Sequence, residues 1–212
     1  MNIVEGGEYL CLAIAHAYAV LIVRSRFAVN GASSPTILFE NHLATTEANH
    51  LAAGKLVAKM LGINKVGKPA KLIDGMSFGS YLKKIENPRT ISDWLTKDEK
   101  VVDWYRNEPW CTFHFTPNAY YHMFSGMQKA HDIERMKKLP KGLPILITSG
   151  AEDPVGAWGE GVRKTFMVYS DNTECEVSIR MYDDDRHEIL NETDKEQVYA
   201  DMLEFLDSCL EK

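Results

Sequence analysis

The sequence lacks the cysteine and charge patterns that mark several classes of protein. Its four cysteines are far apart and form no Cys-x-x-Cys pair (Cys11, Cys111, Cys175 and Cys209). This spacing argues against a disulfide framework or a cysteine zinc site and indicates a reducing compartment. The formal net charge of −6 argues against a nucleic-acid surface, because phosphate binding needs clustered lysine and arginine. The seven histidines show no metal-ligand spacing, so we expect no metal and no cofactor.

A hydrophobic run long enough to cross a membrane is also missing. The longest apolar stretch, residues 9–23, is shorter than the ~20 residues that a transmembrane helix needs. Glu5 and Glu8 precede it, where a secretory signal would carry positive charge. We therefore expect a cytoplasmic protein with no membrane span.

The first 62 residues contain short buried segments of the kind found in α/β proteins. Residues 8–15 predict a buried strand, and the alanine-rich run after them predicts a helix. A second apolar run, residues 35–41, follows a cluster of turn-forming residues and predicts another strand. Residues 43–62 have helical spacing and end at Gly62, a plausible helix C-cap.

Residues 63–140 differ in character from the segments on either side. They hold three of the four tryptophans (Trp94, Trp104 and Trp110) and few strand-like runs. The stretch 92–109 predicts short helices that begin at serine or threonine and end near proline. This segment fits either a lid or a layer of helices packed on the core. We predict a helical cap over residues 63–140 and a core made of residues 1–62 and 141–212.

The last 70 residues alternate between strand and helix patterns. Residues 143–150 and 175–182 predict two strands, the second with strict alternation of apolar and polar side chains. Helical patterns follow each of them, over residues 158–171 and 193–210. Strand–helix–strand–helix order predicts an α/β protein whose parallel sheet is covered by helices.

Two residues that could share a catalytic site follow these strands. Asp153 comes just after the first strand and His187 just after the second, and functional groups gather at the carboxyl ends of parallel strands. A carboxylate that orients an imidazole acting as general base is the arrangement of a serine-hydrolase triad. The order Asp and then His, with a serine earlier in the chain, is that of the α/β-hydrolases.

Four stretches resemble one group of α/β-hydrolases: the lysophospholipases, monoacylglycerol lipases and serine aminopeptidases. "LPILITSGAEDPVG" and "VSIRMYDDDRHEILNE" resemble the group's C-terminal part, and "KLIDGMSFGSYLKKI" and "WLTKDEKVVDWYRNEPWC" resemble its cap. The resemblance implies a partial α/β-hydrolase fold, with a mostly parallel sheet flanked by helices and a helical cap insertion. It also implies that Asp153 and His187 are the acid and base of a triad, acting on a lipid or another acyl ester.

The nucleophile is missing from the position where the resemblance implies it. Spacing places the elbow serine near Ala15, and no serine or cysteine lies between Leu12 and Arg24. The pattern Gly-x-Ser-x-Gly does occur around Ser77, but the preceding residues are a poor strand, whereas an elbow must follow one. Ser25 and Ser33 are weaker candidates than Ser77.

These observations leave three functions open. In the first, the chain is a hydrolase relative or fragment that has lost its nucleophile. In that case we also expect it to lack the loop that supplies one oxyanion donor. Alternatively, it is active through Ser77 or as one piece of a split enzyme, or it is a non-catalytic module that binds a lipid or a protein. The strand expected at residues 8–15 would have an unpaired edge. A second copy or an N-terminal-half partner would cover that edge.

Overall fold

A sheet with strand order β1-β2-β3-β4 forms the centre of the computed structural model, which describes residues 22–24, 36–39, 48–64 and 67–210. The strands are β1 (Ile22–Arg24), β2 (Thr36–Phe39), β3 (Pro144–Gly150) and β4 (Glu176–Tyr182). β1 runs antiparallel to β2, whereas β2, β3 and β4 are parallel to one another. The sheet is therefore mostly parallel, and the two predicted strands β3 and β4 are confirmed.

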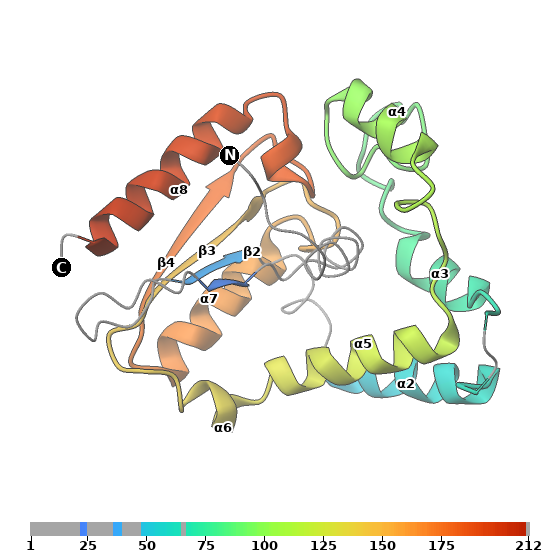
Figure 1. Cartoon of the computed structure of the whole chain (residues 1–212), viewed down its shortest axis with the longest axis horizontal. Coiled ribbons are helices and arrows are strands. Elements are labelled where there is room, and N and C mark those ends of the chain that lie inside the picture. Colours follow the sequence, from blue (N-terminus) through green and yellow to red (C-terminus); the bar gives the residue numbers. More distant parts are fainter. Residues whose placement is uncertain (1–21, 25–35, 40–47, 65–66, 211–212) are drawn as a thin grey trace.

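Two helices cover the two faces of this sheet. α7 (Glu160–Asn172) and α8 (Lys195–Leu210) lie on opposite sides of β3 and β4 (Figure 1). The side chains of β3 alternate between the two faces: Ile145 and Ile147 pack toward α7, and Leu146 packs toward α8. The alternation predicted for β4 is also observed, because its apolar side chains join the α7 side (Val177, Ile179 and Met181).

A set of helices lies between β2 and β3 in the chain, and we call it the helical insert. It consists of α2 (Ala48–Leu61), α3 (Lys71–Phe78), α4 (Glu99–Asn107), α5 (Pro117–Ala130) and the short α6 (Ile133–Met136). α2 and α5 lie side by side away from the sheet, while α3 and α4 connect them to the region beside β4 and α8 (Figure 1). Leu51 and Ala58 of α2 are fully buried. The chain leaves α2 at Gly62, whose φ of 98° suits the predicted C-cap.

Two local predictions differ from the structure. The helix predicted after residue 15 does not include residues 22–24, which form β1; isoleucine and valine are β-branched and favour strands. In the stretch 92–109, α4 begins after Asp98 rather than after serine or threonine, and the Asp98 carboxylate accepts a hydrogen bond from Lys100 N at 2.9 Å. The strand predicted at residues 8–15 lies outside the described residues.

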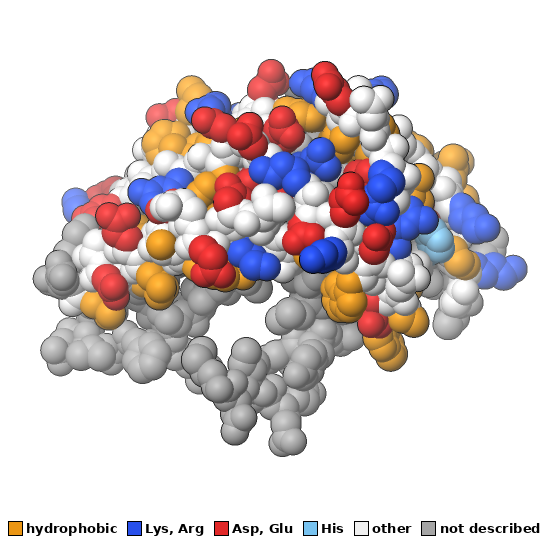
Figure 2. Space-filling model, turned by 90° about the horizontal axis from the view of Figure 1, so that it is seen from above, with side chains coloured by type: hydrophobic (Ala, Val, Ile, Leu, Met, Phe, Trp, Pro, Cys, Tyr) orange, Lys and Arg blue, Asp and Glu red, His pale blue; other side chains and the backbone are white. Residues whose placement is uncertain are grey.

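The described surface carries charges of both signs. Acidic and basic side chains are mixed over the face seen in Figure 2. Within the described part of the chain, no helix combines the length and apolar character that a membrane span requires.

The end of β3 meets the loop after β4 at an unusually close distance. A Cβ atom at Gly150 would lie 2.2 Å from the carbonyl oxygens of Asp185 and Arg186. Ala151 N donates to Tyr182 O at 2.8 Å, and Glu152 N donates to Asp185 O at 2.9 Å. The two loops that follow β3 and β4 are thus joined backbone to backbone, which only glycine at position 150 permits.

We predict that Gly150→Ala destabilises the protein by about 1–3 kcal/mol, because backbone atoms must move to admit the methyl group. Gly126→Ala is the matched control: nothing lies within 4 Å of its added Cβ on α5, so we expect stabilisation of up to about 1 kcal/mol. Urea unfolding followed by circular dichroism measures both. Equal stability of Gly150→Ala and the parent chain would contradict the steric argument.

Candidate active site

The loops after β3 and β4 bring Asp153 and His187 into direct contact. His187 Nδ1 lies 3.2 Å from Asp153 Oδ2 and 3.3 Å from Oδ1. Asp153 is fully buried and His187 is 4% exposed. The pair that the sequence placed at two strand ends therefore meets in space, shielded from water.

The Asp153 carboxylate is held in place by its own loop. Val155 N donates to Asp153 Oδ1 at 2.8 Å, and Trp158 N donates to Asp153 O at 2.8 Å. The first bond holds the carboxylate and the second holds the backbone carbonyl of Asp153, so the side chain keeps a constant orientation toward its partner. Asp153 can thus orient the imidazole of His187 through Nδ1, which leaves Nε2 as the atom for proton transfer.

Opposing effects act on the pKa of His187. Burial lowers it, but the negative charge of Asp153 and the hydrogen bond to that carboxylate outweigh burial and hold the pKa above its ordinary value. A histidine with a raised pKa stabilises the fold fully below its unfolded pKa of about 6.5. That stabilisation is lost as the pH rises through the folded pKa.

An aromatic side chain from the helical insert covers the imidazole. The ring centroids of Trp94 and His187 are 4.9 Å apart, with an interplanar angle of 54°. Trp94 itself packs against Tyr81, whose ring centroid is 5.0 Å away, and the two rings form a buried cluster with Leu95 and Val155. Sequence reasoning did not assign this role to Trp94. The one available signal was its place in the stretch that resembles a cap.

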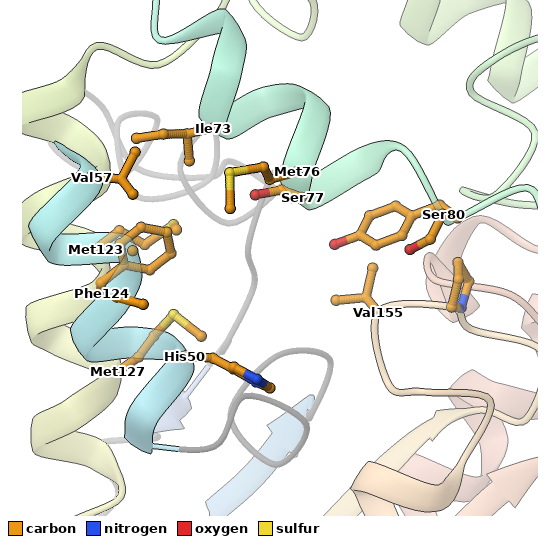
Figure 3. A pocket seen from close by; sticks show the side chains of 14 residues that line it. His50, Val57, Ile73, Met76, Ser77, Ser80, Met123, Phe124, Met127 and Val155 are labelled. Carbon is orange, nitrogen blue, oxygen red and sulfur yellow. The ribbon is translucent and has the colours of Figure 1, made fainter. Parts of the chain in front are cut away.

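A cavity of about 460 Å³ lies between the α2–α5 pair, α3 and the Asp153 loop. Figure 3 shows Val57, Met123, Phe124 and Met127 on one side and Ile73 and Met76 near α3, with Val155 facing them. Pro154 and Val155, the two residues after Asp153, also line it. Its wall is therefore mostly apolar and continues into the loop that carries Asp153.

Ser77 lines this cavity but does not stand on a nucleophile elbow. It is the penultimate residue of α3, which follows a loop rather than a strand. An elbow places its serine in a tight turn between a strand and a helix. The other positions considered for the nucleophile (Ala15, Ser25 and Ser33) lie outside the described residues.

The described residues contain no group of three or more histidine, cysteine, aspartate or glutamate side chains that could hold a metal ion. A second buried carboxylate, Asp185, lies two residues before His187. Asp185 forms an ion pair with Lys97, with 3.0 Å between Oδ1 and Nζ. Burial raises the pKa of Asp185 to about 6, although the hydrogen bond to Lys97 lowers it. The Asp185 contribution to stability therefore falls as the pH rises from about 4 to about 6.

The serine aminopeptidase (S33) hydrolase family matches residues 32–194, well over half of the chain. The chain belongs to this family. The match includes both Asp153 and His187. No curated protein sequence matches the chain.

Solved structures of esterases and lipases share the fold. A highly thermostable carboxyl esterase from Bacillus coagulans in complex with glycerol is 25% identical, with a TM-score of 0.68, over 93% of this chain and 61% of that one. A lipase in its open form is 17% identical, with a TM-score of 0.72, over 94% of this chain and 63% of that one. The chain thus spans about three fifths of the length of these structures. The partial α/β-hydrolase fold expected from the sequence is confirmed.

We predict that Asp153→Asn lowers the pKa of His187, because the substitution removes the negative charge that favours the imidazolium. A titration of the His187 ring protons by NMR measures the change, with His187→Gln to assign the resonance. The stability lost by Asp153→Asn should be largest below about pH 6.5 and shrink as the pH rises through the folded pKa. Glu152→Gln, an exposed neighbour, is the control and should leave the titration unchanged; an unchanged titration in Asp153→Asn would contradict the pairing.

Proposed function

We propose that this chain carries the acid and base of a carboxylester hydrolase acting on lipid-like acyl esters such as monoacylglycerols or lysophospholipids. The buried contact between Asp153 and His187, beside an apolar cavity, is the observation that carries the proposal. In this chemistry a hydroxyl attacks the ester carbonyl while the imidazole accepts its proton, and the imidazole then returns the proton to the leaving alcohol. The carboxylate holds the imidazole and stabilises its charged form.

We further propose that the chain alone does not turn over esters, because it has no nucleophile at the elbow position. The segment from Leu12 to Arg24 contains neither serine nor cysteine, and alanine near position 15 has no atom that attacks a carbonyl. Removing a triad nucleophile lowers the rate by about 10⁶ in a serine protease. A separate polypeptide could supply the serine and cover the strand expected at residues 8–15. The reducing, cytoplasmic setting inferred from the scattered cysteines is part of the same proposal.

A fluorophosphonate probe tests the missing nucleophile. We expect no covalent labelling of the purified chain, because the probe reacts with a serine activated by a base. Ser77→Ala and His187→Ala are made in parallel. Labelling of the parent chain that both substitutions abolish would overturn the proposal and favour Ser77, which lines the cavity. Labelling that appears only after a separate protein is added would identify a split enzyme.

The cavity should bind an acyl chain whether or not the ester is cleaved. Ala53 of α2 lines the cavity, and it is exposed enough to accept a larger side chain, whereas its exposed neighbour Ala52 does not line it. We predict that Ala53→Trp weakens binding of a fluorescent monoacylglycerol ether roughly tenfold, as displacing about two methylene groups would. Ala52→Trp is the matched control and should bind like the parent.

The two assays together separate the candidate functions. Acyl binding without labelling, even after a separate protein is added, favours a non-catalytic lipid-binding module, since the vestigial site then holds the ligand without reacting. Equal binding by Ala53→Trp and the parent chain would count against the cavity as the acyl site.

A further inference from the structure

The loop that carries His187 lies against a segment of the helical insert, residues 93–97. Glu188 N donates to Leu95 O at 2.7 Å, and His187 N lies 3.5 Å from Trp94 O. These bonds link residues about ninety positions apart in the sequence. The backbone on both sides of the imidazole is therefore attached to the insert.

One buried carboxylate joins the two segments. Glu192 is fully buried. Its Oε2 accepts hydrogen bonds from Thr96 Oγ1 at 2.8 Å and from Lys97 N at 3.0 Å. Its Oε1 accepts from Arg186 N, the amide next to His187, at 2.9 Å. Both carboxylate oxygens thus accept hydrogen bonds. One bonds to the insert, and the other bonds to the loop that carries His187, which we call the base loop.

Burying a carboxylate in this way is costly unless donors surround it. Three donors do so here, two of them backbone amides whose positions the fold determines. Arg186 adds a second link, because its Nη1 donates to Asp93 O at 2.6 Å. An alanine at position 192 would leave the amides of Lys97 and Arg186 without this acceptor and remove one of the links between the base loop and the insert.

We propose that Glu192 is a positioning residue for His187: it holds the base loop on the segment that carries Trp94, so that the imidazole stays between Asp153 and the Trp94 ring. This inference rests on the proposed function only in naming His187 as the base. The contacts that carry it are the Glu192 bonds and the ring contact between Trp94 and His187. The helical insert would then determine the geometry of the site as well as cover it.

NMR titration of His187 tests the proposal without any need for turnover. In Glu192→Ala we expect the pKa of His187 to fall toward its ordinary value of about 6.5, because the loop no longer holds the imidazole against Asp153. Glu192→Gln keeps one acceptor oxygen, so the pKa of His187 in this variant should lie between those of Glu192→Ala and the parent chain. Glu196→Ala, on the exposed side of α8, is the matched control and should leave the pKa unchanged.

A folded Glu192→Ala variant with the parent's His187 titration would overturn the proposal. If Glu192→Ala does not fold, Thr96→Val replaces it. Valine keeps the side-chain shape and removes the hydroxyl that donates to Glu192, together with its bonds to Asn191 O and Asp98 N. A lowered pKa of His187 in Thr96→Val supports the positioning role, and an unchanged pKa overturns it. A failure of the ester-hydrolase proposal looks different: it leaves these titrations intact and shows instead as a lack of acyl binding.

Discussion

The parallel pairing of β3 with β4 is the constraint on which the rest of the site depends. Their register places Gly150 opposite Tyr182, so the two strands end at the same level. The loops that follow must then leave the sheet side by side. Because Gly150 has no side chain, these loops approach until their backbones touch. The contact between Asp153 and His187 follows from that approach.

The helical insert contributes to the core of the site as well as to its surroundings. Trp94 lies over the imidazole, and residues 93–97 share backbone hydrogen bonds with the base loop. On the other side, the α2–α5 pair forms the apolar wall of a cavity that reaches the Asp153 loop. An acid, a base and an apolar cavity therefore meet where the insert joins the sheet. The division predicted from the sequence, a cap over residues 63–140 and a core made of residues 1–62 and 141–212, stays a prediction.

Much of this arrangement could be predicted because its signals are local. Strand β4 shows strict alternation, β3 is an apolar run bounded by proline and glycine, and both are confirmed close to their predicted limits. Asp153 and His187 could be singled out since each directly follows a strand. The predicted N-cap of α4 was wrong, because aspartate and threonine are both good caps and lie two residues apart in "TKD". β1 was missed because a three-residue strand is too short to show a recognisable alternation of side chains.

By itself, the sequence determined the α/β class, the two strand ends and the two residues that follow them, Asp153 and His187. It also determined that no serine or cysteine stands between Leu12 and Arg24. Only the tertiary structure decided that Glu192 and Trp94 belong to the surroundings of His187. The reason is physical: periodicity and turn residues describe neighbours along the chain. Contacts across some ninety residues depend instead on how the insert folds back onto the sheet.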